Sequence, residues 1–451
     1  MIFKFIRYTQ PGWMFNIKPS KNISYSSCLY HPEWLPLNGV VLNVDSTFET
    51  ISAQYADIGY RAWNKGHLTW IDKPTADKIE TLPAPSLKDE YTFIAKYWGK
   101  AWATFALLNR LVSLHNPVEE IQAFRSSNKT KRINPYDDPI RREEYNNFKS
   151  TLVEAQPLVA VIIPTLNRYT YLQDVLHDLE KQDYTNFEVI VVDQSNPFNE
   201  AFYKQFKLKL NVIFQKERLL WTARNKAIKS TNAQYLLFFD DDSVVAADWI
   251  TQHIKCLDFF DCDISAGVSL AKVGMKISQS YNYFRWADQF DSGNALVKRK
   301  VFSAVGLFDE QFNKQRMGDG EFGIRAYLNG YRSISNPYAS RVHLKVPAGG
   351  LREMGSWDGF RPKKWFAPKP IPSVVYLYKK YYPKQLYRFV ILLGIILSNV
   401  SYKNKGSKKM LALSVVLAVI KAPLLYFQFL KSNGIAKAML RTGDKIKYLN
   451  S

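Results

Sequence analysis

The sequence predicts an α/β fold in which a mostly parallel sheet carries helices on both faces. Three observations between residues 158 and 242 predict it. Apolar runs of strand length recur, a helical apolar repeat follows the first run, and strand and helix patterns then alternate along the chain. Strands of a parallel sheet are buried on both faces, so they read as continuous apolar runs.

The first strand is predicted at Leu158–Ile163, where an apolar run stops at Pro164. The next apolar side chains have the i, i+3, i+4, i+7 spacing of one helix face: Leu172, Val175, Leu176 and Leu179. Three further strands and a helix follow, with the strands at Phe187–Val192, Asn211–Phe214 and Tyr235–Phe239 and the helix at Thr222–Ser230. Such sheets bind ligands beyond the carboxyl ends of their strands, where Thr165, Asp193 and Asp240–Asp242 lie.

Length and composition limit the class of protein. The 451 residues correspond to two or three domains, and 47% apolar with 22% charged residues is typical of a folded chain. The three cysteines, Cys28, Cys256 and Cys262, lack CxxC spacing, which argues against a zinc ribbon or a disulfide scaffold and fits a reducing cytosol. The chain reaches Gln10 and Pro11 before any long apolar run, so we expect no signal peptide.

The chain divides into four predicted parts. Residues 1–125 form an N-terminal α+β domain of unknown role, and residues 126–157 form a polar connector. Residues 158–372 form the α/β domain, and residues 373–451 form a basic helical tail. In the first part we expect strands at Val40–Val44 and Leu68–Ile71 and a helix at Glu90–Leu114. The connector predicts a helix from Ile140 to about Val153.

Much of the net charge of +21 lies near the C-terminal end of the sequence. From Arg361 to Ser451 there are 18 Lys and Arg and one acid, Asp444, around the apolar stretches Phe389–Leu397 and Met410–Leu430. This pattern is typical of binding to an anionic membrane surface. We expect an in-plane, peripheral association with the cytoplasmic face of the cell membrane, with a true span or soluble packed helices as alternatives. A chain ending near Pro372 should then not bind the membrane and should still hydrolyse donor slowly.

Three consecutive carboxylates, Asp240–Asp242, follow the apolar run Leu236–Phe239. They repel one another, and a hard divalent cation with oxygen ligands offsets that charge, in particular one that also holds phosphates. The alternative is a solvated acidic turn that caps the following helix. The position at the end of a buried strand favours the metal site.

Six segments resemble, in the right order, the motifs of family 2 glycosyltransferases, the inverting enzymes of GT-A fold. Val161–Arg168 resembles the opening strand and loop, Val189–Ser195 the second strand and Ala223–Ile228 the ARN helix. Phe239–Asp242 resembles the DxD metal motif. Ser292–Arg299 with Val305–Glu310 resembles the acceptor-side stretch, and Gly318–Arg325 resembles the start of the base-carrying helix. The resemblance covers about Leu158–His343. It implies a GT-A nucleotide-diphospho-sugar transferase-like domain.

The resemblance implies a donor site for a nucleotide diphosphate sugar, with a UDP-sugar as the first expectation. The residues that it assigns to the nucleotide are Thr165, Asp193, Arg224, Asp240 and Asp241. It assigns Asp242 and His343 to Mg²⁺ or Mn²⁺, which bridges the phosphates and neutralises charge on the leaving diphosphate. A surface position is the alternative for Arg224, and a structural role is the alternative for His343.

The resemblance also implies a catalytic base. Asp319 would take the proton of the acceptor hydroxyl as its oxygen attacks the anomeric carbon, with Glu321 as the second candidate. Both carboxylates could instead be favoured by the dipole of a helix that begins there. Three residues are assigned to the acceptor, Asn294, Trp286 and Trp365, with core packing as the alternative for both tryptophans.

Three features depart from the family pattern. Gly318 stands where the family has Glu before the base, and Gln194 replaces the second Asp of the second strand. The bulky run Leu219-Leu220-Trp221 replaces the glycines that often precede the ARN helix. These departures predict a donor pocket that is tighter or differently shaped.

The predicted function is metal-dependent, inverting transfer of a sugar from a nucleotide diphosphate sugar to a hydroxyl of a lipid-linked glycan in the synthesis of a bacterial surface polysaccharide. A nucleotide-sugar-binding protein without catalysis is one alternative, prompted by the missing Glu before Asp319. A nucleic-acid-binding protein is the other, prompted by a pI of about 9.5. A nucleic-acid-binding protein would carry its basic residues on an element that faces a groove of the nucleic acid. In this chain they are concentrated around apolar runs, so we expect no nucleic-acid partner.

Overall fold

The chain forms two compact units in the computed structural model. The model describes residues 3–19, 23–26, 43–271, 274–344, 346, 359–362, 364–401 and 407–449. The N-terminal unit comprises Met1–Asn146, Ser278–Asp288 and Leu328–Arg332. The sheet unit comprises Asn147–Ile277, Gln289–Tyr327 and Ser333–Ser451.

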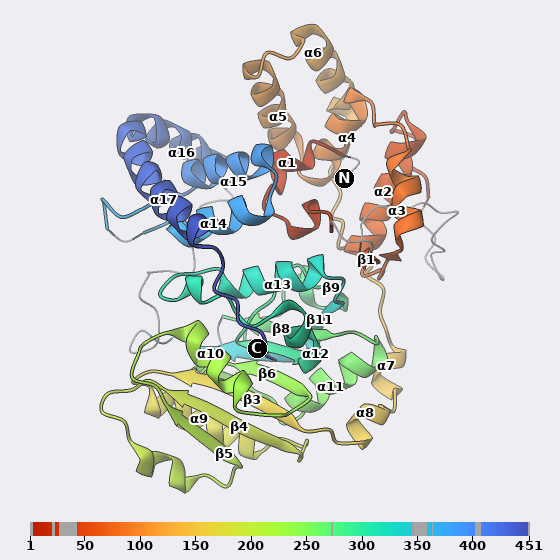
Figure 1. The fold of residues 1–451 in the computed structure, drawn as a ribbon. Coiled ribbons are helices and arrows are strands. Elements are labelled where there is room, and N and C mark those ends of the chain that lie inside the picture. The colour runs from red at the N-terminus through yellow and green to blue at the C-terminus, as the bar shows by residue number, and fades with distance from the viewer. Residues whose placement is uncertain are drawn as a thin grey trace. The chain divides into compact units, whose positions relative to one another are not determined.

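A mixed sheet forms the core of the sheet unit (Figure 1), with its strands in the order β5-β4-β3-β6-β10-β8-β11-β7. Their bounds are β3 Val159–Thr165, β4 Phe187–Asp193, β5 Leu210–Phe214, β6 Tyr235–Phe239, β7 Ser243–Val245, β8 Ile264–Leu270, β10 Asn294–Lys298 and β11 Ser333–His343. The neighbours β5, β4, β3 and β6 are parallel, and β11 is parallel to β8. In contrast, β10 runs antiparallel to β6 and β8, and β7 runs antiparallel to β11.

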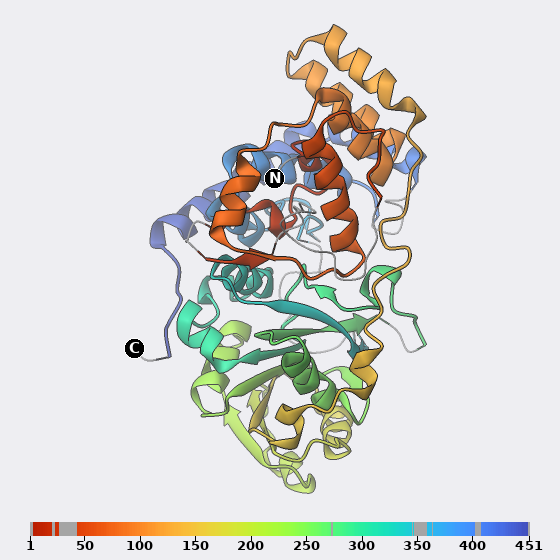
Figure 2. The same ribbon diagram turned by 90° about the vertical axis from the view of Figure 1, so that its right-hand side faces the viewer.

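Helices pack on both faces of this sheet (Figure 2). The helices and 3-10 turns are α8 Thr151–Glu154, α9 Tyr169–Glu180, η3 Glu200–Gln205, α10 Leu220–Lys229, α11 Trp249–Phe259, α12 Arg299–Val305, η5 Glu310–Phe312 and α13 Gly318–Leu328. The apolar face predicted for α9 is confirmed, because its four side chains are at most 1% exposed. α10 packs on β3 and β4, and α11 packs on β8 and β11. The predicted α/β GT-A arrangement is confirmed.

The carboxyl ends of β3, β4 and β6 meet at one edge of the sheet. Thr165 pairs with Asp193 across β3 and β4, and Asp240 directly follows β6. The strand end predicted at Pro164 is wrong, because β3 continues to Thr165. β3 pairs with β6 only as far as Ile162, so the proline, which has no N–H to donate, lies beyond that ladder.

The N-terminal unit is mostly helical and has an aromatic core. Its helices and 3-10 turns are α1 Ile6–Thr9, η1 Met14–Asn16, α2 Ile51–Asn64, α3 Lys73–Glu80, α4 Leu87–Tyr97, α5 Lys100–Val112, α6 Pro117–Ser126, η2 Ser127–Lys129, α7 Glu144–Asn147 and η4 Gln279–Tyr281, and its short strands are β1 Tyr25–Ser26, β2 Trp70–Ile71 and β9 Arg285–Trp286. β1 and β2 pair antiparallel. Phe3 stacks on Phe93 with ring centroids 3.9 Å apart. The N–H groups of Lys4 and Phe5 donate to the Glu90 carboxylate at 2.7 and 2.8 Å, which fixes the first residues to α4.

Two helices predicted near this unit differ in the structure. The helix expected over Glu90–Leu114 is broken into α4 and α5 at Gly99, whose φ of +89° is a conformation that glycine adopts without strain. The helix expected from Ile140 to Val153 is replaced by the short helices α7 and α8. The strand expected near Leu68–Ile71 is confirmed as β2, whereas the strand expected at Val40–Val44 lies largely outside the described residues.

Four helices follow the sheet in sequence: α14 Pro372–Tyr381, α15 Lys384–Leu397, α16 Lys408–Ile420 and α17 Ala422–Thr442. They belong to the sheet unit, and α14 packs on both α15 and α17. Val375 and Tyr376 of α14 are at most 1% exposed. Among the described residues, none of these helices is by itself long and apolar enough for a membrane span, although α16 and α17 together, bent by 79°, meet that test.

Candidate active site

A cavity of about 300 Å³ lies at the carboxyl edge of the sheet. Its walls carry five carboxylates and five cationic side chains: Asp240, Asp241, Asp242, Asp291 and Asp319, with Arg168, Arg224, Lys314, Arg316 and Arg341. Because the acidic and basic side chains are equal in number, the cavity suits a ligand with little net charge. The charged groups of such a ligand would bind to different side chains of the walls.

Asp240 is held between two arginines. Its Oδ1 accepts a hydrogen bond from Arg224 at 3.1 Å, and its Oδ2 accepts one from Arg341 at 2.7 Å. Burial alone would raise the pKa of Asp240, but the charges of Arg341 and Arg224 hold that pKa well below its usual range. Gly293 permits this approach, since a Cβ there would lie 2.2 Å from Asp240 Oδ2. Asp240 is therefore ionised at neutral pH.

Asp241 is bonded to two side chains from the β3 end of the cavity. Its Oδ1 accepts from Arg168 at 2.8 Å, and its Oδ2 accepts from the hydroxyl of Thr165 at 2.8 Å. Burial raises the pKa of Asp241 to about 6, and neighbouring Asp242 adds to the rise while Arg168 opposes it. Asp241 lines the cavity, but Thr165 does not. The hydroxyl of Thr165 holds Asp241, and the predicted contact of Thr165 with a nucleotide stays a prediction.

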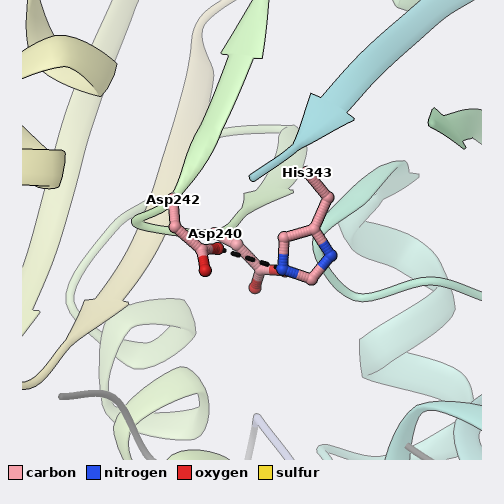
Figure 3. A group of neighbouring side chains, drawn as sticks. All are labelled: Asp240, Asp242 and His343. Carbon is pink, nitrogen blue, oxygen red and sulfur yellow. Dashed lines mark ion pairs between the residues drawn. The ribbon is translucent and has the colours of Figure 1, made fainter. Parts of the chain in front are cut away.

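Asp240, Asp242 and His343 form a candidate metal site (Figure 3). Each offers one ligand atom, and these atoms all lie within 4.8 Å of one another. His343 reaches Asp242 because it is the last residue of β11, where it pairs with Ser243 of β7. His343 Nε2 lies 3.1 Å from Asp242 Oδ1. Two carboxylates and an imidazole are donors that fit Mn²⁺ or Mg²⁺, so the residues present suit such an ion.

Asp319 lies in the first turn of α13 and lines the same cavity. Burial, together with repulsion from Asp291, raises the pKa of Asp319 to about 6. No Lys or Arg of the described part of the chain lies within ion-pair distance of it, whereas Arg341 lies 3.0 Å from Asp291. A carboxylate in this environment can accept a proton near neutral pH.

Gly318 and Trp221 explain two of the departures from the family pattern together. A Cβ at position 318 would lie 2.4 Å from Cε2 of Trp221. The indole is fixed, because its N–H donates to the carbonyl of Phe312 at 3.0 Å and its ring lies 5.3 Å from the guanidinium of Arg224. A glutamate therefore does not fit beside Trp221, and the missing acid is a steric consequence of the tryptophan.

Asp193 lies outside the cavity walls, and its predicted contact with a nucleotide stays a prediction. Its carboxylate accepts hydrogen bonds from the hydroxyls of Tyr169 and Tyr203 at 2.7 and 2.8 Å and from the N–H of Ser195 at 2.8 Å. Asp193 is fully buried and is absent from the cavity walls. Its role is to hold the residues that follow β4.

Glu321 and Asn294 are buried structural residues rather than a second base and an acceptor contact. Glu321 lies 3.0 Å from Arg325 and 3.3 Å from Lys380, and it also accepts from the hydroxyl of Tyr381. The amide of Asn294 accepts from the Trp249 indole at 2.9 Å and donates to the carbonyls of Val268 and Ala339 at 3.1 and 2.9 Å. With these groups engaged, neither residue is placed to contact a substrate in the cavity.

The two tryptophans assigned to the acceptor also lie away from the cavity walls. Trp286 belongs to the N-terminal unit and is 5% exposed, with ring centroids 6.4 Å from Trp63 and 5.6 Å from Trp70. Core packing is therefore its role. Trp365 is 70% exposed and lines a different cavity among the C-terminal helices.

Sequence reasoning missed five charged residues of the cavity: Arg168, Asp291, Lys314, Arg316 and Arg341. Arg341 stands two positions before His343 on β11, and side chains two apart on a strand share a face, so the strand period could have found it. Arg168 ends the first motif segment but had no assigned role. Asp291 directly precedes the acceptor-side segment, and no spacing rule connects it to Arg341.

Residues 160–308 match the family model Glycosyl transferase family 2. The chain contains a family 2 glycosyltransferase domain. The matched residues include β3, β4, β6 and the carboxylates Asp240–Asp242. Asp319 and His343 lie beyond them, and the fold brings both to the same cavity.

Two curated relatives support this assignment. EpsH of Bacillus subtilis (strain 168), which is named as a glycosyltransferase, is 22% identical over 313 residues, or 62% of this chain and 88% of its own. A PGL/p-HBAD biosynthesis glycosyltransferase of Mycobacterium bovis (strain BCG / Pasteur 1173P2) is 23% identical over 266 residues, or 54% and 97%. A solved structure, the mannosyltransferase PcManGT of Pyrobaculum calidifontis in complex with GDP-Man and Mn²⁺, has a TM-score of 0.43 at 16% identity and covers 66% of this chain and 93% of its own.

Proposed function

We propose that this family 2 glycosyltransferase transfers a sugar, with inversion, from a nucleoside diphosphate sugar to a hydroxyl of a glycan acceptor. The observation that carries the proposal is one cavity whose walls hold both the Asp240–Asp242–His343 group and Asp319. Such a transfer needs positive charge at the diphosphate and a carboxylate at the acceptor hydroxyl, and this cavity offers both.

The donor end of the cavity is the part that contains Asp240, Asp242 and His343. These residues would hold Mg²⁺ or Mn²⁺, which supplies positive charge to the leaving diphosphate when it is bound. A divalent cation carries two positive charges, and the diphosphate of a nucleotide sugar carries two negative charges. Binding both therefore leaves the charge balance of the cavity walls unchanged. A UDP-sugar is the first donor to test, as the family resemblance implies.

Asp319 is the proposed base. As the acceptor oxygen forms its bond to the anomeric carbon, the hydroxyl proton passes to Asp319, and the diphosphate leaves with the electron pair of the broken C–O bond. A pKa of about 6 leaves the carboxyl ionised at pH 7 and still basic enough to take the proton. Glu321 does not share this role, because it is ion-paired to Arg325 and Lys380.

We further propose a lipid-linked glycan of a surface polysaccharide as the acceptor and a peripheral position on the membrane for the enzyme. The support comes from α16 and α17, where large apolar side chains are 51–70% exposed: Val415, Val416, Val419, Ile420, Tyr426 and Phe427. An exposed apolar surface of this extent on a basic segment suits an anionic membrane.

The test is a screen of nucleotide sugars for Mn²⁺-dependent transfer and hydrolysis, with Asp319→Asn and Asp242→Asn as variants. Removing a general base costs about 10²–10⁴ in rate, so Asp319→Asn should lose turnover to that extent while calorimetry shows unchanged donor binding. Asp242→Asn should lose Mn²⁺-dependent donor binding. Asp261→Asn is the matched control, because its side chain is 90% exposed and is not part of the cavity walls.

Two results would contradict the proposal. Donor that binds but is never transferred or hydrolysed would identify a nucleotide-sugar-binding protein without catalysis. Equal, metal-independent donor affinity in the wild type and in Asp242→Asn would remove the metal site.

A further inference from the structure

A second cavity, of about 380 Å³, lies among the C-terminal helices of the sheet unit. Four cationic side chains line it: Arg361, Lys364, Lys369 and Lys421. None of the described residues that line it is an acid. A concave site of this size is large enough for a small ligand, and its charge selects an anion.

Lys369 is the central observation. It is 9% exposed, and no carboxylate in the described part of the chain pairs with its ammonium group. Burial, together with the charges of Arg361 and Lys421, lowers the pKa of Lys369 to about 8. A buried cation without a counter-charge is costly, so an anion bound beside it would stabilise this arrangement.

Two other cations of the cavity wall, Arg361 and Lys421, are oriented by neighbouring groups. The guanidinium of Arg361 donates to the carbonyls of Leu397 and Val400, both at 2.8 Å. Lys421 lies 5.8 Å from the ring centroid of Trp365. An aromatic ring orients Lys421 without neutralising it, so the charge of Lys421 adds to that of Lys369.

Apolar side chains stand next to these cations in sequence. Phe366 follows Trp365 and is 67% exposed, and Ile420 precedes Lys421 and is 69% exposed. Lys421 lies at the bend between α16 and α17, and α15 packs beside α16 (Figure 1). An anionic group in the cavity therefore has exposed hydrocarbon close to it, which is the chemistry of a lipid with a charged head.

We propose that this cavity binds the phosphate group of an anionic phospholipid, with Lys369 and Lys421 as its main contacts. The proposal rests on the membrane association proposed above and adds a specific, saturable site to it. The lipid would hold the bend between α16 and α17 at the level of the headgroups, with the neighbouring apolar side chains toward the acyl chains.

The test titrates full-length protein with monomeric dihexanoyl-phosphatidylglycerol by calorimetry, below the concentration at which that lipid forms micelles. No surface is then present, so general attraction to a charged membrane does not contribute. We expect one site per chain, with affinity reduced about tenfold or more in both Lys369→Gln and Lys421→Gln, since hydrogen bonds to charged groups are of that strength. Lys437→Gln, an exposed lysine of α17 outside the cavity, is the matched control and should bind like the wild type.

The outcomes separate this site from the membrane association as a whole. Equal affinity in all four proteins would overturn the site, as would equally tight binding of inorganic phosphate, which would identify a free anion as the ligand. If phosphatidylglycerol vesicles still sediment wild type and Lys369→Gln alike while no monomeric lipid binds, membrane association stands and the site falls. Unchanged donor binding by Lys369→Gln verifies that this variant is folded.

Discussion

Asp319 differs from the other four carboxylates of the active-site cavity in its surroundings. Asp240, Asp241, Asp242 and Asp291 each have an arginine within 3.1 Å. Asp319 has no such partner among the described residues, and burial raises its pKa to about 6. The pKa of Asp241 is also raised to about 6, but Thr165 and Arg168 engage both of its oxygens. Asp319 has no such arginine in the described part of the chain and can exchange a proton with a substrate, as a general base must.

The pH dependence of the rate follows from this pKa. The base must be ionised, and a raised pKa means that ionisation is lost as pH falls through about 6. We expect kcat to fall about tenfold per pH unit below that value, measured between pH 4.5 and 8 at saturating donor. The residual kcat of Asp319→Asn should not show this fall below about pH 6. A wild-type profile that stays flat through pH 6 would exclude Asp319 as the base.

A second residue-scale prediction concerns the two glycines at the start of α13. Gly318→Ala places a Cβ 2.4 Å from the fixed indole of Trp221, and overpacking of this kind typically costs about 1–3 kcal/mol. Gly320→Ala is the matched control, because the nearest heavy atom to a Cβ there is 3.9 Å away. Urea unfolding should show a loss of stability in the first variant and none in the second. Equal stability of both would show that Trp221 moves aside freely.

The residues that sequence predicted correctly for the cavity are those whose position follows from the backbone. Asp240 and Asp242 come directly after a buried parallel strand, and Asp319 comes at a helix start. Asp193 also ends a strand, yet Tyr169 and Tyr203 cover its carboxylate. Those tyrosines come from α9 and η3, and no local pattern states which side chain they will contact.

At the scale of elements, Asp309 joins three parts of the sheet unit. Its carboxylate accepts from the hydroxyl of Tyr376 on α14 at 3.0 Å and from the N–H of Lys445, beyond α17, at 3.0 Å. In return, the N–H of Leu307 donates to the carbonyl of Lys447 at 2.8 Å. The helices beyond residue 372 therefore complete the packing of the domain, which the apolar and basic composition of that region did not reveal.

A chain that ends at Ile371 is consequently expected to misfold, contrary to the expectation from sequence. It loses four almost fully buried apolar side chains: Val374, Val375, Tyr376 and Leu377. At about 1.5–3 kcal/mol each, their loss is comparable with the whole stability of a typical domain. Soluble yield and near-ultraviolet circular dichroism provide the measurement.

Tyr376→Phe is the control for that truncation, because it removes the hydrogen bond to Asp309 and keeps the apolar packing of α14. It should remain folded with a modest loss of stability, on the order of 0.5–1.5 kcal/mol for one lost hydrogen bond, because Lys380 still lies 3.7 Å from Asp309 Oδ2. If the shortened chain instead folds and binds donor like the full chain, α14 is an appendage and this interpretation is wrong.

The elements that sequence predicted well are those with strong local patterns. β3, β4, β5, β6 and α10 lie within two residues of their predicted bounds, and α9 contains all four apolar positions predicted for it. The long helix expected before residue 114 was wrong because one glycine with positive φ separates α4 from α5, and the apolar stretch after residue 410 is divided between α16 and α17 by a 79° bend. Such breaks depend on tertiary packing, and the spacing of apolar residues along the sequence does not predict that packing.

At the scale of the whole molecule, charge is unevenly distributed. The segment from Arg361 onward holds 18 of the 61 Lys and Arg but only one of the 40 acids. In the described structure, this segment also carries exposed apolar side chains on α16 and α17. In the proposed membrane association, attraction to an anionic surface and apolar insertion would therefore act from the same helices.

These two contributions respond differently to salt. We expect the full-length protein to sediment with phosphatidylglycerol vesicles and to be released in part at 1 M salt, because the Debye length falls from about 10 Å at 0.1 M to about 3 Å. Apolar insertion does not depend on charge and should retain the remainder. Failure to sediment would remove the membrane proposal. Release by detergent alone would indicate that the bent pair α16–α17 spans the bilayer.

The bonds between Asp309 and Lys445 also have a consequence for synthesis in the cell. The two residues are 136 positions apart, which a ribosome takes about seven to thirty seconds to translate at typical rates. During that interval the nascent domain lacks the segment that closes it, while α15 and α16 have already been made. We therefore expect the domain to finish folding only after its apolar helices have been translated. If the proposed membrane association holds, a membrane could already capture those helices, and translation order would favour completion of the enzyme at that surface.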